Sequence, residues 1–543
     1  MSLMGQMMQM PLSISSLLVH AARHHGDSEI VSKRVEGDIH RTSWAEVELR
    51  SRKLAQALQR LGCEPGERVG TLAWNGYRHV EIYYAVSGSE LVCHTINPRL
   101  FPQQVAWIIN DAQDKILFVD LNILPLVEKL APTLPALKRV VLMCGRDNMP
   151  REPVLDNLLC YEDLIEAEDG HYTWPAFDEN TAASICYTSG TTGNPKGAVY
   201  SHRSTVLHAY ASALPDSMCL RATDAMLPVV PMFHVNAWGV PYAAALVGCK
   251  LVLPGHHLDG ASLYELMEKE QVTISAGVPT IWQGLLNHVQ TNNLKFSSFK
   301  TTVIGGSACP PSMLRTFEDD YNVEVVHAWG MTELSPIGTV CRLKRKHLDL
   351  PIEDRQKILE KQGRAVFGID MRIVDADGQP QPWNGIASGD LEVRGHWVID
   401  SYFNIEQSPL HEGWFPTGDV ATIDADGYMQ IVDRSKDVIK SGGEWISSID
   451  LENVLMAHPA VQQAAAIAAH HPKWDERPLM VVVKKPGAQV TREELLAFFK
   501  GKIPSWQTPD DVVFVDELPH TATGKLYKLK LREMFGNHKL PTA

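Results

Sequence analysis

One stretch near the start of the chain carries its apolar residues largely on a single helical face. It covers residues 42–61, and Ser43 with Glu46 has the spacing of a capping box. The spacing predicts an amphipathic helix with Trp44, Val47, Leu49, Leu54, Leu58 and Leu61 largely on one face. We expect this helix to open the first lobe of the molecule.

Further along, short apolar runs alternate with longer amphipathic stretches. Such runs predict buried strands, and they occupy residues 116–119, 140–143, 251–253, 272–275, 303–304 and 323–326. Strands that alternate with helices form parallel sheets covered on both faces, so the pattern predicts an α/β fold with mainly parallel sheets. Folds of this kind bind ligands beyond the carboxyl ends of their strands.

The pattern changes between residues 368 and 432 to alternating strands with tight turns. Residues 369–373 and 428–431 each lie near an Asp-Ala-Asp-Gly turn, at 375–378 and 424–427. Neither turn has the series of acidic ligands that an EF-hand needs, so both are predicted to be plain turns. We therefore expect a small antiparallel β unit here.

The last hundred or so residues have the pattern of a second, smaller domain. Strands are predicted at 480–483 and 512–515, with a helix at 492–499 between them, which suffices for a small α+β domain. We place the boundary at residues 434–436. The chain is then expected to divide into domains at 1–434 and 435–543.

Composition narrows the class of protein further. With 543 residues the chain is too long for one core, and 45% apolar with 21% charged residues is typical of a globular protein. A formal net charge of −14 disfavours a nucleic-acid groove or a polybasic anchor. The nine cysteines form no C-x-x-C pair, which favours a reducing cytoplasm. Neither a signal peptide nor a membrane helix is expected from the apolar runs.

The segment 187–197 concentrates hydroxyls, glycines and one lysine directly after an apolar run. Glycines let the backbone approach a polyanion, hydroxyls donate hydrogen bonds to phosphate oxygens, and Lys196 adds a positive charge. The segment is not a Walker A loop, because Pro195 stands where that motif needs glycine. A triphosphate is the ligand that this composition favours.

This segment is similar to the phosphate loop of the adenylate-forming enzymes, a superfamily that includes acyl-CoA synthetases, peptide-synthetase adenylation domains and beetle luciferases. Other segments resemble its remaining motifs in family order: the acyl-pocket segment at 231–239, the adenine loop at 305–310, the magnesium motif at 327–333, the ribose motif at 417–419, the hinge motif at 433–444 and the lysine loop at 518–525. The N-terminal third matches more diffusely. The resemblance implies ATP, Mg²⁺ and coenzyme A as ligands, and a small C-terminal domain that moves.

The resemblance assigns the nucleotide to residues from several motifs. Glu333 and Thr188 are the expected magnesium ligands and catalytic residues, Asp419 is expected to bind the ribose hydroxyls, and Arg434 to brace the sugar. The remaining expected nucleotide contacts are Ser189, Gly190, Thr191, Thr192, Gly193, Lys196, Gly306, Ser307, Ala308, His327, Ala328, Trp329, Gly330, Met331 and Thr332.

The resemblance also implies two chemical steps in two domain orientations. Lys525 is expected to stabilise adenylation between the carboxylate and the α-phosphate, whereas Lys528 and Lys530 are predicted to be solvated. Lys436 falls at the hinge position. After rotation, coenzyme A is expected to meet Lys440, Gly442, Gly443 and Glu444. The basic stretch 342–346 is predicted to be a solvated loop rather than a phosphate site.

The acid is expected to be a simple aliphatic one. The predicted pocket offers no cation or aspartate for a second charged group, and it consists of His234, Val235, Trp238, Gly305, Gly306, Trp329, Gly330, Met331, Pro336 and Ile337. His234 is also a catalytic candidate, with a satisfied core histidine as the alternative.

The segment around Trp238 most closely resembles medium-chain acyl-CoA synthetases of the alkane-utilisation type, long-chain members and methylmercaptopropionate-CoA ligases. A medium-chain fatty acid is our leading hypothesis, and related long-chain enzymes imply a homodimer. A catalytically silent nucleotide-binding homologue is the alternative from another class, although Glu333, Asp419, Arg434 and Lys525 are all present.

Overall fold

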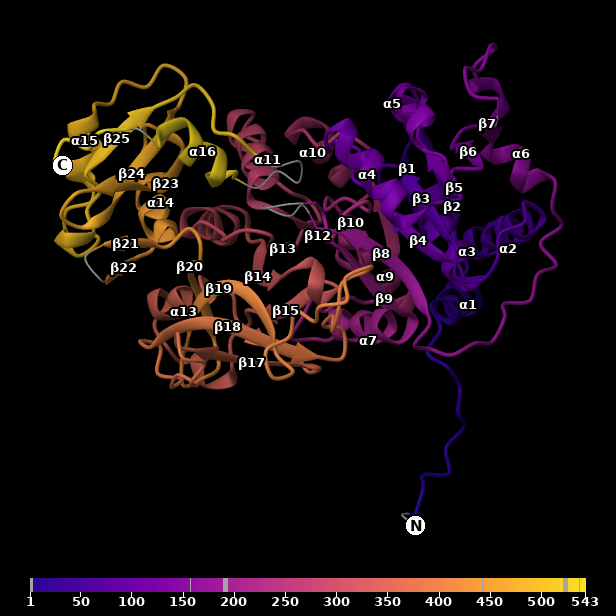
Figure 1. Cartoon of the computed structure of the whole chain (residues 1–543), viewed down its shortest axis with the longest axis horizontal. Helices are drawn as coiled ribbons and strands as arrows, with labels where there is room; N and C mark the ends of the chain where they lie inside the picture. Colours follow the sequence, from indigo (N-terminus) through magenta and orange to yellow (C-terminus); the bar gives the residue numbers. More distant parts are fainter. Residues whose placement is uncertain (1–2, 157, 189–193, 442–443, 521–525, 537) are drawn as a thin grey trace.

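The computed structural model describes residues 3–156, 158–188, 194–441, 444–520, 526–536 and 538–543, apart from the side chains of 444 and 445. The chain forms two large sheets, a small antiparallel sheet and a C-terminal sheet (Figure 1). The helices of the first lobe are α1 (Ile14–His24), α2 (Trp44–Arg60), α3 (Tyr77–Gly88), α4 (Pro102–Ala112), α5 (Leu124–Leu130), α6 (Tyr161–Glu166), α7 (His202–Ala213), α8 (Val235–Trp238), α9 (Val240–Val247), α10 (Gly260–Lys269), α11 (Pro279–Thr291), α12 (Pro311–Arg315) and α13 (Ile352–Leu359).

The first large sheet has seven strands in the order β7-β6-β5-β3-β4-β8-β9. Its strands are β3 (Arg68–Leu72), β4 (Val92–Thr95), β5 (Ile116–Val119), β6 (Arg139–Leu142), β7 (Leu158–Cys160), β8 (Ala182–Tyr187) and β9 (Gly197–Ser201). Neighbouring strands are parallel except β8 and β9, whose register pairs Tyr187 with Gly197. The predicted phosphate loop therefore connects β8 to β9 at the carboxyl end of a parallel strand.

The second large sheet has nine strands in the order β16-β15-β14-β13-β12-β10-β11-β1-β2. They are β1 (Glu29–Lys33), β2 (Ile39–Ser43), β10 (Ala225–Pro228), β11 (Lys250–Leu253), β12 (Ile274–Gly277), β13 (Thr301–Ile304), β14 (Glu324–Gly330), β15 (Ile337–Val340) and β16 (Arg364–Ala365). The six neighbouring strands β14, β13, β12, β10, β11 and β1 pair in parallel. At the edges of the sheet, β2 pairs antiparallel with β1, and β15 and β16 continue antiparallel from β14.

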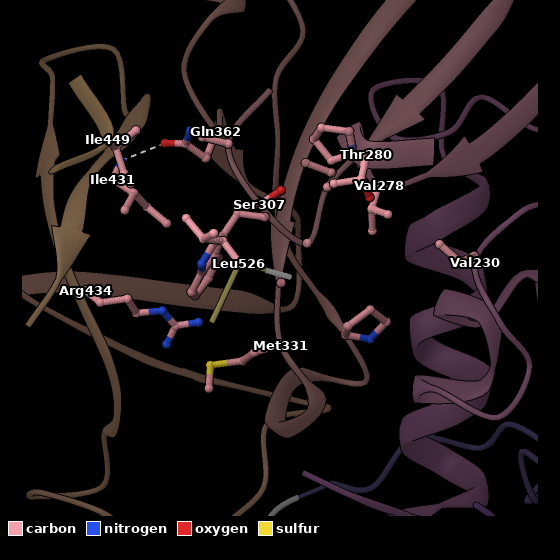
Figure 2. Close-up of a pocket in the computed structure, with 18 of the residues that line it drawn as sticks. Val230, Val278, Thr280, Ser307, Met331, Gln362, Ile431, Arg434, Ile449 and Leu526 are labelled. Carbon is pink, nitrogen blue, oxygen red and sulfur yellow. Dashed lines mark hydrogen bonds between the residues drawn. The ribbon is translucent and has the colours of Figure 1, made fainter. Parts of the chain in front are cut away.

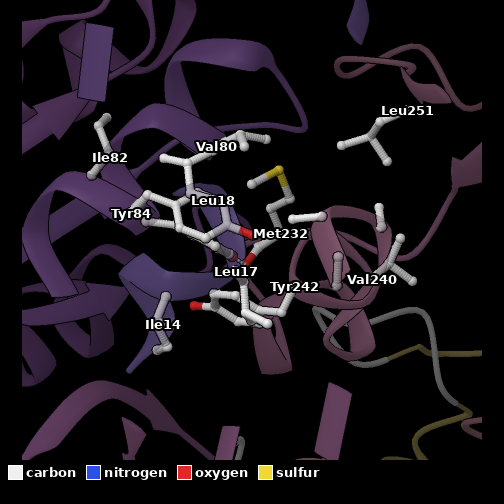
Figure 3. Packing of buried hydrophobic residues seen from close by; sticks show 14 of the residues in the cluster. Ile14, Leu17, Leu18, Val80, Ile82, Tyr84, Met232, Val240, Tyr242 and Leu251 are labelled. Carbon is white, nitrogen blue, oxygen red and sulfur yellow. Dashed lines mark hydrogen bonds between the residues drawn. The ribbon is translucent and has the colours of Figure 1, made fainter. Parts of the chain in front are cut away.

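Both large sheets are covered on both faces, and their inner strands are accordingly buried without interruption, as β5 and β12 show. Along β5, Phe118 packs into the cluster of α1, α2 and α3, while Leu117 packs into the cluster of α4 and α5. Along β11, Leu251 and Val252 divide between two clusters in the same way. Figure 3 shows the central cluster, in which side chains of α1 and α3 meet those of α9. The predicted α/β fold with mainly parallel sheets is confirmed.

The small antiparallel sheet follows, in the order β17-β18-β19-β20. Its strands are β17 (Ile369–Val374), β18 (Ser388–Gly395), β19 (Phe415–Ile423) and β20 (Met429–Arg434). The β unit predicted for residues 368–432 thus has the expected antiparallel pairing. The chain then enters another sheet between Arg434 and Ile439.

The C-terminal sheet contains β21 (Ile439–Ser441), β22 (Glu444–Ile446), β23 (Val461–His471), β24 (Asp475–Lys484) and β25 (Asp511–Phe514). Helices α14 (Ser448–Met456), α15 (Arg492–Phe498) and α16 (Lys528–Phe535) accompany it. The strand predicted at 480–483 lies within β24, and the one predicted at 512–515 overlaps β25, which ends one residue earlier. No helix among the described residues is both long and apolar enough to cross a membrane.

Candidate active site

A cavity of about 870 Å³ opens between the first lobe and the C-terminal part of the chain. Figure 2 shows side chains from both parts around it, among them Ser307, Arg434 and Leu526. Most of the described residues that were predicted for the site line this cavity: Thr188, His234, Val235, Trp238, Gly305, Gly306, Ser307, Ala308, Ala328, Trp329, Gly330, Met331, Thr332, Glu333, Pro336, Ile337, Asp419, Arg434 and Lys436.

A buried carboxylate on β19 is held by two donors from other strands. Arg434 lies directly opposite Asp419 on β20, and its Nε is 2.8 Å from Asp419 Oδ1. Trp329 Nε1 donates to Oδ2 at 2.9 Å. The Asp419 side chain is 2% exposed, whereas that of Arg434 is 43% exposed. The pair therefore presents a fixed carboxylate and a partly accessible guanidinium to the cavity.

Glu333 follows β14 in a short 3₁₀ helix, Thr332–Leu334. The Tyr402 hydroxyl donates to Glu333 Oε1 at 2.8 Å, and the Lys196 ammonium lies 4.9 Å from the centre of the Tyr402 ring. Burial and the Glu333 charge raise the pKa of Tyr402, so its hydroxyl remains a donor. Tyr402 belongs to no motif identified in the sequence, and only its contacts reveal its part in the site.

Thr188 stands at the beginning of the predicted phosphate loop. Its N–H donates to the Lys196 carbonyl at 2.9 Å, and the Lys196 N–H donates to Thr188 Oγ1 at 3.4 Å. These bonds close the base of the loop. Of the predicted site residues, Ser189, Gly190, Thr191, Thr192, Gly193, Gly442, Gly443, Lys525 and the Glu444 side chain lie outside the described part of the structure.

His327 lies behind the cavity, where it fixes the adenine loop rather than lining the space. Its Nε2 accepts from the Cys309 N–H at 3.2 Å, and its Nδ1 donates to the Glu360 carbonyl at 3.1 Å. Because a carbonyl can only accept, the proton is on Nδ1. Burial lowers the pKa of His327 to about 4, so the ring is neutral at pH 7.

The acyl-pocket segment contains a turn of left-handed backbone that its sequence does not signal. Val235, Asn236, Ala237 and Trp238 have φ angles of 46°, 51°, 51° and 55°. Left-handed geometry costs non-glycine residues roughly 1–2 kcal/mol each, so the surrounding contacts must stabilise it. One such contact is Asn236 Nδ2, which donates to Ser184 Oγ on β8 at 3.0 Å. The turn thereby connects the acyl segment to the strand before the phosphate loop.

Gly305 gives the Trp238 ring room at the wall of the cavity. A Cβ at Gly305 would lie 3.2 Å from the tip of that ring and 2.9 Å from the Ala328 carbonyl oxygen. His234 precedes the left-handed turn and lines the same wall. All ten residues predicted for the acid pocket line this one cavity.

Lys528, Lys530 and Lys440 differ in their exposure and in their partners. The prediction that Lys528 is solvated is wrong, because its side chain is 11% exposed and its ammonium lies 2.7 Å from Glu452 Oε1. Lys530 is exposed, as expected, and pairs with Glu533. Lys440 is also exposed and lies outside the cavity wall, with its N–H bonded to Glu476 at 2.7 Å.

The basic stretch 342–346 is half-buried at residues 342–344 and exposed at Arg345 and Lys346, and its charges are largely paired. Arg342 bonds Glu324, and Lys344 and Lys346 both contact Asp426. These ion pairs leave little charge for a phosphate, but the predicted solvation holds only for Arg345 and Lys346, because the Arg342 side chain is 15% exposed.

Comparisons with known proteins agree with this architecture. A model described as AMP-binding enzyme matches residues 18–403, and one described as AMP-binding enzyme C-terminal domain matches residues 450–525. Among solved structures, the anthranilate CoA ligase AuaEII with anthranoyl-AMP superposes with a TM-score of 0.86 at 24% identity, covering 97% of this chain and 98% of that one. At that identity the likeness shows a shared fold.

Two curated relatives are similar over nearly their whole length. A 3-methylmercaptopropionyl-CoA ligase of Ruegeria lacuscaerulensis is 56% identical over 534 residues, covering 98% of this chain and 99% of that protein. A medium-chain-fatty-acid–CoA ligase of Ectopseudomonas oleovorans is 53% identical over 536 residues, covering 98% of each. By its family models and these relatives, the chain belongs to the AMP-binding enzyme family.

Proposed function

We propose that the protein is an ATP-dependent acid–CoA ligase that activates a medium-chain carboxylic acid. The observation that carries this proposal is the cavity, in which Thr188, Glu333, Asp419 and Arg434 face the same space as the apolar acyl segment. The acid carboxylate attacks the α-phosphate of ATP and displaces pyrophosphate. The thiol of coenzyme A then attacks the acyl carbonyl of acyl-AMP and displaces AMP.

In this proposal the nucleotide lies with its sugar at Asp419 and Arg434. Asp419 accepts from the ribose hydroxyls, and Arg434 braces the sugar while it holds Asp419 at 2.8 Å. The adenine lies between the loop of Gly306, Ser307 and Ala308 and the end of β14, and His327 supports that loop from behind. The phosphates extend toward Thr188 and Lys196.

Glu333 and Thr188 fit a magnesium ion in their chemistry. Both offer hard oxygen donors at the cavity wall, and Tyr402 fixes the Glu333 carboxylate through a 2.8 Å hydrogen bond. Magnesium takes few protein oxygens and completes its shell with phosphate and water. When bound, it supplies positive charge against the phosphates of ATP.

Lys525 is proposed as the residue that stabilises the adenylation transition state. Support comes from its flanks, because His520 and Leu526 both line the cavity and form an isolated β-bridge with each other. A cation close to the α-phosphate would offset the charge that develops there. The domains are proposed to be 1–434 and 435–543, with Lys436 as the hinge, and rotation would bring Lys440, Gly442, Gly443 and Glu444 to coenzyme A.

A panel of acids tests the substrate class. Acetate, octanoate, palmitate, 3-methylmercaptopropionate, benzoate and an amino acid are compared by kcat/KM for CoA-ester formation. The proposal expects the highest value for octanoate. If kcat/KM were highest for 3-methylmercaptopropionate, the substrate would be the one named for the Ruegeria relative. If it were highest for palmitate, the protein would be a long-chain enzyme. A maximum at benzoate or the amino acid would refute the proposed class.

We further propose a cytoplasmic homodimer. All nine cysteines are free thiols, which is typical of a reducing compartment. Sedimentation equilibrium of the purified chain tests the assembly, since each chain has a mass of 60.4 kDa. A single species of that mass at micromolar concentration would refute the dimer.

A further inference from the structure

Arg99 brings a positive charge to the cavity from outside the motifs identified in the sequence. It follows β4, in the turn that leads to α4. The residue is exposed and lines the cavity together with the acyl segment. The predicted acid pocket contains neither lysine nor arginine, so this guanidinium is a charge that only the structure reveals.

Two aromatic rings hold the Arg99 guanidinium. Its Cζ lies 5.3 Å from the centroid of the Trp74 ring and 5.8 Å from that of the Phe233 ring. The two rings meet edge to face, with 5.7 Å between their centroids. The five N–H donors of a guanidinium lie in its own plane, so contact with the face of a ring occupies none of them. The rings can therefore orient the charge while its donors stay available to a ligand.

Arg99 differs in its partners from most other arginines and lysines of the cavity wall. Arg434, Lys528 and Arg532 each lie 2.5–2.8 Å from a carboxylate oxygen. Within the described ranges of the chain, the Arg99 guanidinium has neither a hydrogen bond nor an ion pair, and of the other lining cations only Lys436, at the proposed hinge, also lacks an ion pair. An unpaired guanidinium at the wall of a binding cavity favours an anionic ligand.

The first large sheet places Arg99 beside the start of the predicted phosphate loop. Strands β4 and β8 are parallel neighbours, and their last paired residues are Thr95 and Cys186 (Figure 1). Arg99 is the fourth residue after Thr95 and Thr188 the second after Cys186, and both line the cavity. Residues that follow neighbouring parallel strands share one edge of the sheet, which is where such folds bind ligands. Arg99 and Thr188 therefore face one ligand-binding region from adjacent strands.

We propose that Arg99 binds a phosphate group of one of the two nucleotide substrates, ATP or coenzyme A, at the edge it shares with Thr188. This inference rests on the proposed function. A guanidinium can donate two parallel hydrogen bonds to one phosphate, which fixes the orientation of the group as well as its position. Both nucleotides carry several phosphate charges, whereas the acid carries one carboxylate that must remain free to attack.

The test compares Arg99→Met and Arg99→Lys with the wild-type chain. Methionine keeps an unbranched side chain against the two rings but removes the charge, and lysine keeps the charge without the planar fork. Arg345→Met is the matched control, because Arg345 is exposed and lies outside the cavity wall. Octanoate-dependent exchange of pyrophosphate into ATP gives KM for ATP, and conversion of prepared octanoyl-AMP to the thioester gives KM for coenzyme A. Calorimetric titration gives Kd for each nucleotide without turnover.

We expect Arg99→Met to raise KM and Kd for one of the two nucleotides by roughly tenfold or more, with kcat within about threefold of wild type. A rise for ATP would assign Arg99 to the phosphates of ATP, and a rise for coenzyme A would assign it to those of coenzyme A. Arg99→Lys should recover part of the affinity, and Arg345→Met should match the wild type. The difference between Arg99→Met and wild type should shrink at high ionic strength, because salt screens the lost attraction.

Three outcomes would overturn the inference. If KM and Kd for both nucleotides stayed within about twofold of wild type in Arg99→Met, Arg99 would not bind phosphate. A rise confined to KM for octanoate would make the carboxylate of the acid its ligand. A fall of kcat in both steps together with a lowered midpoint of thermal unfolding, at unchanged Kd, would show a purely structural role. A wild-type chain without either half-reaction would refute the proposed function itself, and the titrations would still test the phosphate contact.

Discussion

Glu333 and Tyr402 line the same wall of the cavity. Tyr402 donates to its carboxylate at 2.8 Å, and Lys196 lies over the Tyr402 ring. A carboxylate held in this way cannot turn from the cavity without losing a hydrogen bond. The arrangement suits a group that must meet a metal-bound triphosphate at a fixed place.

The Glu333→Gln variant tests whether Glu333 is a magnesium ligand. It preserves size and the Tyr402 contact but removes the charge that magnesium requires, so kcat for adenylation should fall on the order of a hundredfold. The rate is measured by pyrophosphate release over a range of magnesium concentrations. Tyr402→Phe, which removes only the hydrogen bond, should cost roughly tenfold or less. Equal activity of Glu333→Gln and wild type would remove Glu333 from the metal site.

Among the elements, the left-handed turn of Val235, Asn236, Ala237 and Trp238 departs furthest from what its residue types favour. None of the four is glycine, and Val235 is β-branched. The turn persists because Asn236 bonds Ser184 and because Val235, Asn236 and Ala237 are buried. His234 and Trp238, at the two ends of this segment, line the cavity.

Asn236→Ala should therefore destabilise the protein by about 1–3 kcal/mol, since it removes a buried hydrogen bond and a residue that tolerates positive φ. Denaturant unfolding measures the loss. The control is Asn293→Ala, at φ 51° on an exposed surface, which should cost about 1 kcal/mol or less. The turn would not depend on its asparagine if the two variants had equal stability.

The sequence was most informative about elements with strong local patterns. The helix predicted at 42–61 is α2, and Ser43 caps its first turn by accepting a hydrogen bond from the Glu46 N–H at 3.3 Å. The strand predicted at 116–119 has those bounds in the structure. The strand at 272–275 is displaced to Ile274–Gly277. The strand at 323–326 continues to Gly330, because the magnesium motif itself extends it beside β15.

Long-range features had no local signal. Residues of β1 and β2 join a sheet whose other strands begin near residue 225, and hydrophobic alternation cannot specify such a partner. Motif resemblance identified the cavity walls, but it did not include Tyr402. Nor did it suggest that Lys528 is buried, because the carboxylate that pairs with it, Glu452, is distant in sequence.

The whole molecule contains several histidines that folding keeps neutral. Burial lowers the pKa of His79, His202 and His327 to about 4 and that of His208 to about 3. These rings are protonated near pH 6.5 when the chain is unfolded, so the unfolded state binds more protons between pH 4 and 6.5. The contribution of these histidines to stability should then fall as the pH falls through that range.

Each histidine is expected to lose about 1.4 kcal/mol of its contribution to the free energy of unfolding for each unit by which folding lowers its pKa. Asp120 acts in the opposite direction, because burial raises its pKa to about 7 and its folded form gains protons as the pH falls. Burial also raises the pKa of further carboxyls, among them Glu81, Asp114 and Asp433. The histidine contribution is therefore isolated by comparing His208→Gln with the wild type, and the midpoint of thermal unfolding should fall less from pH 7 to pH 5 in the variant. An equal change in both chains would contradict the neutral, buried state of the His208 ring.

Under the proposed function one cavity performs both adenylation and thioester formation. The decisive experiment follows pyrophosphate and acyl-CoA in a single reaction of the purified chain with ATP, magnesium and octanoate. Pyrophosphate should appear only when the acid is present, and octanoyl-CoA only after coenzyme A is added. Lys525→Ala should slow pyrophosphate release on the order of a hundredfold or more while ATP still binds. Pyrophosphate release that does not depend on the acid, or full adenylation by Lys525→Ala, would contradict the account.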